Sequence, residues 1–253
     1  MNLRNNFAVL LVGLSCLFIN TNSKFRIVKG RSSNIADSPY IVSLHIGGKH
    51  KCGGSLVTMR IVITAAHCLK YYKAKEVIVV AGVTYLSQPG QSRIARRLYI
   101  PFGYSRTTNN MDVGAIKVRT PFIPGPLVQA IQLCNTELKL GTKMQISGWG
   151  ATNPKIIEAT NTLQTANVPI VSTRDCASRY GVIGRILTKT MICAGSGGTD
   201  TCGGDSGGPG VVKGRLCAVV SWGAKCGDPY FAGVYTNVNN AKVLKFIKKA
   251  MKK

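Results

Sequence analysis

The loop Thr201–Pro209, with the sequence TCGGDSGGP, constrains this chain more than any other segment. Its glycines and closing proline exclude a helix or a central strand, because glycine adopts backbone conformations costly to other residues and proline lacks an N–H group. Such a loop can direct several backbone N–H groups at one point beside the Ser206 hydroxyl, as stabilising the oxyanion of acyl transfer requires. The alternative is a glycine-rich turn that happens to contain Ser and Asp, and the rest of the chain must decide between them.

Two further motifs upstream support a catalytic role for this loop. His67 stands in the segment TAAHC, directly after the apolar run Ile61–Ile63. Asp112 stands alone at the head of a second apolar, strand-like segment. With these motifs in the order His, Asp, Ser, the chain from residue 26 to residue 253 resembles a trypsin-like serine peptidase of the chymotrypsin family.

The resemblance implies a role for each motif residue. Ser206 would be the nucleophile, His67 the general base that takes its proton, and Asp112 the carboxylate that orients the imidazole. The backbone N–H groups of Gly204 and Ser206 would form the oxyanion hole. The alternative for His67 is a structural histidine beside a disulfide.

Substrate preference is implied by Asp200, which stands six residues before Ser206. In trypsin-like members this position forms the floor of the primary specificity pocket. A carboxylate shielded from water there would select substrates with Arg or Lys before the cut. The walls of the pocket would be formed by Ser221, Trp222, Gly223 and Gly233. A surface aspartate is the alternative for Asp200.

The segment KFRIVKG around Arg26 resembles the activation junction of the family. Cleavage after Arg26 by a trypsin-like protease would free the ammonium group of Ile27. In the family, this group enters the protein and pairs with the carboxylate beside the nucleophile, here Asp205. Because either charge alone is costly to bury, the pair would form only after cleavage and would then order the glycine-rich loop. An ordinary basic turn is the alternative, and Lys29 departs from the glycine usual at its position.

The start of the chain predicts export from the cell. Residues 1–23 are typical of a secretory signal, since Arg4 precedes an apolar stretch, Phe7–Ile19, that is shorter than the about 20 residues needed to cross a bilayer. A membrane anchor is the alternative. Residues 24–26 would be a short propeptide of the insect type, and residues 27–253 the trypsin-like peptidase domain. We therefore expect a secreted, extracellular zymogen without a membrane span.

The apolar segments are short, rich in Val and Ile, and separated by turn residues, a pattern typical of all-β sandwiches and barrels. They cover residues 40–46, 60–63, 77–80, 131–133, 144–146, 216–221 and 233–238. The resemblance, and not this pattern, implies two packed six-stranded antiparallel β-barrels, over about residues 27–122 and 123–253, with the active site between them. An amphipathic helix ends the chain, with Val243 and Ile247 on its apolar face. We expect it to pack on the second barrel, and binding to a membrane surface is the alternative.

Nine cysteines in a secreted chain predict disulfides, and Cys16 would leave with the signal. The sequence alone leaves the pairing of the other eight open. The resemblance implies the pairs Cys52–Cys68, Cys176–Cys193 and Cys202–Cys226, which leaves Cys134–Cys217. This last pair departs from trypsin, where a bridge usually involves the positions held here by Met144 and Val212. A metal site is the alternative use of these cysteines, but with three histidines and no C-x-x-C pair we expect no metal and no cofactor.

Charge is the least ordinary feature of the composition, because 33 Lys and Arg face 9 Asp and Glu, a formal net charge of +24. Three of the acids would have internal roles, so the exposed surface is almost wholly cationic. This predicts polyanionic partners such as heparin-like glycans, although no nucleic-acid readout motif accompanies the charge. One patch on the first barrel would comprise Lys70, Lys73, Lys75, Arg93, Arg96 and Arg97. The alternative is a generally cationic surface without a preferred partner.

Together these features predict a monomeric secreted serine endopeptidase that cuts proteins and peptides after Arg or Lys. A second function class stays open, namely a non-catalytic, polyanion-binding or antimicrobial protein on the same fold. Inactive relatives usually lose the equivalent of Ser206, His67 or Asp112, and all three residues are present in this chain.

Overall fold

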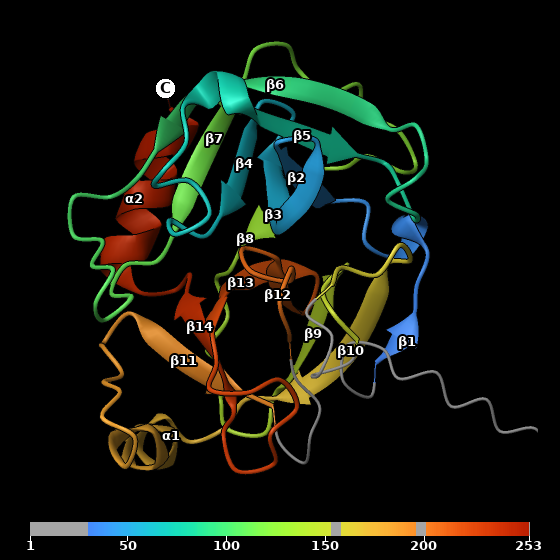
Figure 1. Cartoon of the computed structure of the whole chain (residues 1–253). Helices are drawn as coiled ribbons and strands as arrows, with labels where there is room; N and C mark the ends of the chain where they lie inside the picture. Colours follow the sequence, from blue (N-terminus) through green and yellow to red (C-terminus); the bar gives the residue numbers. More distant parts are fainter. Residues whose placement is uncertain (1–29, 153–157, 196–200, 253) are drawn as a thin grey trace, which may run out of the picture.

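The computed structural model describes residues 30–152, 158–195 and 201–252 (Figure 1). Six antiparallel strands close into a barrel in the order β2–β3–β4–β7–β6–β5. They are β2 (Ile41–Ile46), β3 (Lys49–Thr58), β4 (Ile61–Thr64), β5 (Val77–Ala81), β6 (Gln91–Tyr99) and β7 (Gly114–Val118). Their side chains alternate between the inside and the outside of the barrel: in β5, Val77 and Val79 are buried whereas Ile78 is exposed.

The second β unit is an eight-stranded sheet that curls into a half-barrel below the first (Figure 1). Its main strands are β9 (Lys143–Gly148), β10 (Gln164–Pro169), β11 (Met191–Ala194), β12 (Pro209–Val212), β13 (Arg215–Trp222) and β14 (Gly233–Asn237). They run in the order β10–β9–β12–β13–β14–β11, and a bridge between Ile170 and Ala194 joins the ends of the two outer strands. The all-β fold of two packed β units is therefore confirmed.

Two short strands complete this second sheet. β8 (Gln132–Leu133) pairs in parallel with β13, and β1 (Arg31–Ser32) pairs with β10. The first barrel was expected to cover about residues 27–122. Strand β1 instead belongs to the second unit, because its backbone hydrogen bonds are made with β10, far along the chain.

Helix α2 (Ala241–Met251) ends the chain as expected, but its main contacts are with the first barrel, whereas packing on the second was expected. Its buried face contacts β4, and Phe246 and Ala250 lie against the segment Leu98–Phe102. The Asn240 side chain caps the helix by accepting hydrogen bonds from the N–H groups of its first turn. Among the described helices, none is long and apolar enough to cross a bilayer.

The sequence interpretation missed helix α1 (Thr173–Gly181), which is short and polar. Ser172 caps its first turn, and the helix is bonded to β11 by a disulfide. The structure contains four disulfides, Cys52–Cys68, Cys134–Cys217, Cys176–Cys193 and Cys202–Cys226. Two of them involve the predicted catalytic motifs, since one includes the residue after His67 and another ties the Ser206 loop to Cys226.

Candidate active site

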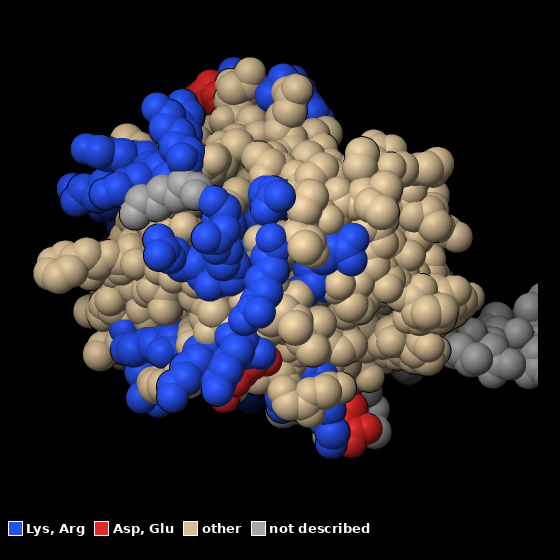
Figure 2. Space-filling view, turned by 90° about the horizontal axis from the view of Figure 1, so that it is seen from above, with Lys and Arg blue, Asp and Glu red and all other residues tan. Residues whose placement is uncertain are grey.

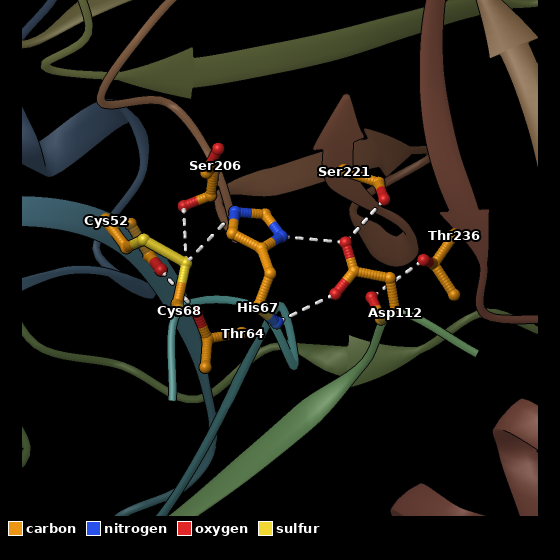
Figure 3. Close-up of polar contacts among 9 residues, drawn as sticks. Cys52, Thr64, His67, Cys68, Asp112, Ser206, Ser221 and Thr236 are labelled. Carbon is orange, nitrogen blue, oxygen red and sulfur yellow. Dashed lines mark hydrogen bonds and ion pairs between the residues drawn. A yellow bond between two sulfur atoms is a disulfide. The ribbon is translucent and has the colours of Figure 1, made fainter. Parts of the chain in front are cut away.

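Three segments that are far apart in the chain meet where the closed barrel faces the half-barrel. His67 follows β4, Asp112 precedes β7, and Ser206 precedes β12. Figure 3 shows the His67 ring between Ser206 and Asp112. The Gly53 N–H group of β3 donates to the Ser206 carbonyl oxygen at 2.8 Å, so the loop that carries Ser206 is bonded directly to the first barrel.

Asp112 is fully buried and binds His67 through both of its carboxylate oxygens. Oδ1 accepts a hydrogen bond from the His67 backbone N–H group at 2.9 Å, and Oδ2 lies 2.8 Å from Nδ1 (Figure 3). Ser221 Oγ donates to Oδ2 at 2.6 Å, and Thr236 Oγ1 donates to the Asp112 carbonyl at 2.8 Å. Because a carboxylate only accepts, the His67 proton is held on Nδ1, which leaves Nε2 free to act as a base.

The Nε2 side of His67 faces the loop of Ser206. Cys68 Sγ lies 3.6 Å from His67 Nε2 and 3.7 Å from the Ser206 carbonyl oxygen. Among the described residues, no hydrogen bond joins Ser206 Oγ to His67 Nε2. Contacts between nucleophile and base are often long without substrate and tighten once it is bound.

The N–H groups of Gly204 and Ser206 donate to no acceptor within the described parts of the chain. By contrast, the N–H groups of Asp205 and Gly207 both donate to backbone carbonyls. Gly204 has a φ of +97°, and a Cβ at this position would lie 3.1 Å from the Gly150 Cα. A side chain would therefore be both strained and crowded, and glycine allows the loop to leave two N–H groups free beside Ser206.

His50, to which the sequence analysis gave no role, supports the same loop from β3. Its Nε2 lies 3.0 Å from the Gly204 carbonyl oxygen, and its Nδ1 lies 2.7 Å from Ser43 Oγ. Because a carbonyl only accepts, the proton is on Nε2 and the Ser43 hydroxyl donates to Nδ1. Burial, with a smaller contribution from His45, lowers the pKa of His50 to about 4, so the imidazole is neutral at pH 7.

The Asp205 carboxylate is fully buried. Oδ1 accepts a hydrogen bond from the Gly150 N–H group at 2.8 Å and Oδ2 one from the Cys202 N–H group at 3.0 Å. A Cβ at Gly150 would overlap this carboxylate, so glycine makes its burial possible. Burial raises the pKa of Asp205 to about 6 although the two N–H groups oppose the rise, and no described residue supplies a cation to it. The expected activation residues Arg26 and Ile27 lie outside the described residues.

A pocket of 170 Å³ opens beside Ser206, lined by segments 201–203 and 220–226. Of the predicted wall residues, Ser221, Trp222 and Gly223 line it. Gly233 is not among the described lining residues, because it is buried at the end of β14 opposite Ala194. Lys225 adds a cation to the lining that the sequence analysis did not include. The expected floor residue, Asp200, lies outside the described residues.

The chain matches the family model described as trypsin over residues 27–247. It is 35% identical over 245 residues to hypodermin-A of Hypoderma lineatum, covering 94% of this chain and 96% of that protein. It is also 35% identical to trypsin beta of Drosophila erecta, covering 92% of this chain and 94% of that protein. Among solved structures it resembles neuropsin, a serine protease expressed in the limbic system of mouse brain. The TM-score is 0.80 at 37% identity, covering 88% of this chain and 99% of that chain. The chain therefore belongs to the trypsin family and is a serine endopeptidase.

Proposed function

We propose that Ser206, His67 and Asp112 cleave peptide bonds on the carboxyl side of Arg and Lys. The observation that carries the mechanism is the bonding of His67, because Asp112 keeps the proton on Nδ1 and leaves Nε2 facing the Ser206 loop. Nε2 takes the Ser206 proton as Oγ attacks the scissile carbonyl carbon, and then returns it to the leaving amine. Water, activated in the same way, hydrolyses the acyl-enzyme. The non-catalytic alternative is not favoured, since the family relationship supports an endopeptidase.

The free N–H groups of Gly204 and Ser206 are proposed as the oxyanion hole. As the carbonyl carbon becomes tetrahedral, its oxygen gains negative charge that two fixed N–H groups can stabilise without reorganising. Loss of one such donor typically costs about 3 kcal/mol of transition-state stabilisation. The peptide group that carries the Gly204 N–H is held through its Gly203 carbonyl, which accepts a hydrogen bond from the Ala151 N–H group at 2.7 Å, and His50 holds the next peptide group through the Gly204 carbonyl.

Cleavage after Arg or Lys is proposed because Asp200 directly precedes Thr201, the first described residue of the pocket lining. The Cys202–Cys226 disulfide joins the two segments that form the pocket, and Gly223 leaves space for a long side chain. A carboxylate at the floor would pair with the substrate cation.

Peptide libraries give the test of mechanism and specificity. The activated enzyme should cut after Arg or Lys, and Ser206→Ala should abolish turnover. Asp200→Ser should remove the preference for cations while the triad remains intact. Preferred cutting after Phe, Tyr or Leu would contradict the pocket assignment, and full activity of Ser206→Ala would contradict the mechanism.

We also propose that the chain is made as a zymogen and activated by a trypsin-like protease between Arg26 and Ile27. Support comes from Asp205, a buried carboxylate with two N–H donors and no cation among the described residues. The ammonium group of Ile27, once freed, would neutralise it. Since loss of one partner of a buried pair costs about 3–5 kcal/mol, Asp205→Asn should be cleaved normally but remain poorly active. An uncut chain that turned over substrate as fast as the cut one would disprove this activation.

Secretion is part of the same proposal, with residues 1–23 as the signal, 24–26 as the propeptide and 27–253 as the peptidase domain. The four disulfides agree with an oxidising compartment. Amino-terminal sequencing of the protein from culture medium, before and after activation, tests both cleavage sites. Retention of the first 23 residues in the released protein would contradict the signal assignment.

A polyanion such as a heparin-like glycan is the proposed non-substrate partner. Figure 2 shows Lys and Arg side chains gathered in a band on the face seen from above, with few acidic side chains among them. The helical turn Ala74–Glu76 contacts β6, and Arg97 pairs across β6 and β7 with Lys117. The exposed cations Lys73, Lys75, Arg96 and Arg97 thus lie on neighbouring elements, and no ion pair neutralises them within the described chain.

The other two expected members of this patch have separate contacts. Lys70 Nζ lies 5.5 Å from the centre of the Tyr104 ring, and the Arg93 guanidinium donates to the backbone carbonyls of Ser92 and Pro121. The four remaining cations are therefore the ones to test. They should bind a polyanion with an affinity that falls steeply with salt, because binding releases counterions.

Heparin-column elution of two variants tests this partner. One variant replaces Lys73, Lys75, Arg96 and Arg97 by Ser. The control replaces four exposed cations of the second β unit, Lys143, Arg174, Lys189 and Lys213. We expect the first variant to elute at clearly lower salt than the control, with turnover of small peptides unchanged. Elution of both variants at the same salt concentration would show that heparin binding depends only on net charge.

A further inference from the structure

Arg185 places its guanidinium group over the indole ring of Trp222, with Cζ 4.6 Å from the ring centre. Trp222 lines the pocket beside Ser206, and its neighbour Ser221 is bonded to Asp112. Residues that precede the scissile bond can reach Trp222, because it lines the pocket beside Ser206. Arg185 is therefore a charge beside the path of the substrate and is not part of the catalytic groups.

The Trp222 indole ring, on which the Arg185 guanidinium lies, is held in place by Tyr180. Tyr180 is fully buried and packs edge-on against Trp222, with ring centres 4.8 Å apart. The Tyr180 hydroxyl donates to the Ala232 carbonyl at 2.7 Å and accepts from the Ala224 N–H group at 3.2 Å. The wall of the cleft, from Trp222 to Ala224, is thus fixed before substrate arrives, so the position of Arg185 on it is defined.

The backbone around Arg185 is fixed as well. The chain turns back after helix α1 through Gly184, whose φ is +69°, and the Arg185 N–H group donates to the Tyr180 carbonyl at 3.0 Å. The side chains of Val182 and Ile186 on either side are 77% and 67% exposed. This turn therefore presents a cation between two apolar side chains at the edge of the cleft.

The charge of Arg185 is not neutralised within the described chain, where no carboxylate forms an ion pair with it. The Arg185 guanidinium is thus available to a negative side chain of the substrate and would repel a positive one.

We propose that Arg185 is a specificity-determining residue that selects substrates with Asp or Glu two to four residues before the scissile bond. An extended substrate advances about 3.3 Å per residue, so residues in this range pass the Trp222 ring after the pocket is filled. A carboxylate at one of these positions can accept two parallel N–H hydrogen bonds from the Arg185 guanidinium group, whose orientation is fixed by the indole ring. The inference rests on the proposed entry of Arg or Lys into the pocket.

Fluorogenic peptides that all end in Arg before the cut test this inference. Each peptide carries Glu, Gln or Lys at the second, third or fourth position before the scissile bond. For an exposed ion pair we expect kcat/KM to favour Glu over Gln by about two- to fivefold at one of these positions. The preference should shrink as salt is raised, because the pair is screened.

Three variants separate a direct contact from a general effect of charge. Arg185→Gln should bring the Glu-to-Gln ratio close to one, and Arg185→Glu should reverse the order of Glu and Lys. Arg179→Gln is the matched control, because its guanidinium also lies on an aromatic ring, 4.9 Å from the centre of Tyr230. This control should keep the wild-type ratio.

Two results would overturn the inference. One is an equal loss of rate on all peptides in Arg185→Gln, which would indicate a structural role. The other is an unchanged Glu-to-Gln ratio in that variant. Every comparison is a ratio of kcat/KM values between peptides that carry the same Arg before the cut. If the proposed preference for Arg and Lys is wrong, the whole set of peptides will instead be cleaved poorly, so the two failures can be told apart.

Discussion

Ser221 Oγ donates a 2.6 Å hydrogen bond to Asp112 Oδ2, the same carboxylate oxygen that faces His67 Nδ1. Ser221 also lines the pocket beside Ser206. One buried serine thus connects the wall of the proposed substrate pocket with the carboxylate proposed to orient the base.

Ser221→Ala should lower kcat by about tenfold with little change in KM. A hydrogen bond to a charged group contributes about 1.5–3 kcal/mol, and part of this holds Asp112 in position for the imidazolium. Steady-state kinetics on an Arg peptide measures the change. Ser38→Ala is the control, since this serine is equally buried but contacts Tyr40 and Ser147 instead. Loss of activity in both variants would point to general destabilisation.

His50→Ala should reduce kcat of the cut enzyme by about tenfold, because the Gly204–Asp205 peptide group, which lies between the two N–H groups proposed as the oxyanion hole, loses its donor. His50→Gln retains an N–H donor and should recover part of the rate. His45→Ala is the matched control, because His45 also lies on this barrel but has no bond to the loop. If kcat of His50→Ala matched the wild type, His50 would have no positioning role.

The uncut chain should lose stability through Asp205 as the pH rises from about 4 to about 6. Its pKa is raised by burial from 3.8 to about 6, so the stabilising contribution is complete below pH 3.8 and is lost as the pH passes the folded value. This amounts to about 3 kcal/mol. His50 acts oppositely in the same range, because its lowered pKa makes the folded chain less stable as the pH falls from 6.5 to about 4.

A comparison of two variants separates the contribution of Asp205 to the pH dependence of stability from that of His50. Urea unfolding from pH 4 to pH 7 is compared for Arg26→Gln, which blocks activation, and for the same chain with Asp205→Asn. The free energy of unfolding of Arg26→Gln should fall with pH relative to the double variant. Parallel curves would mean that Asp205 is not buried as a charge in the uncut chain.

Removing the Cys134–Cys217 bridge by a double substitution to Ser should cost about 2–4 kcal/mol of stability. The Cys176–Cys193 bridge is the matched comparison. It spans 17 residues whereas Cys134–Cys217 spans 83, so the entropy of the closed loop predicts a larger loss for the latter by about 1.4 kcal/mol. Peptide mapping without reductant comes first, and free thiols at Cys134 and Cys217 would refute the bridge.

Local signals in the sequence were sufficient for much of the fold. The Val- and Ile-rich runs at 40–46, 77–80 and 216–221 correspond to β2, β5 and β13, because a half-buried strand needs such side chains. The apolar spacing of 243–251 located α2. Helix α1 was missed, since its residues are polar and it is held by a cap and a disulfide. The predicted packing side of α2 was also wrong, because an apolar stripe on a helix does not identify the surface that it packs against.

The sequence by itself determined the chemistry of the site: a serine in a glycine-rich loop, a histidine after an apolar run, and a lone aspartate before a strand. Only the tertiary structure decided what holds these groups in position. The bonds Ser221–Asp112 and His50–Gly204 join residues 109 and 154 positions apart, and Arg185 reaches Trp222 through a turn that follows α1. Side-chain types and turns are encoded locally. Contacts across the two β units depend on how both pack together, and no local pattern in the chain records that packing.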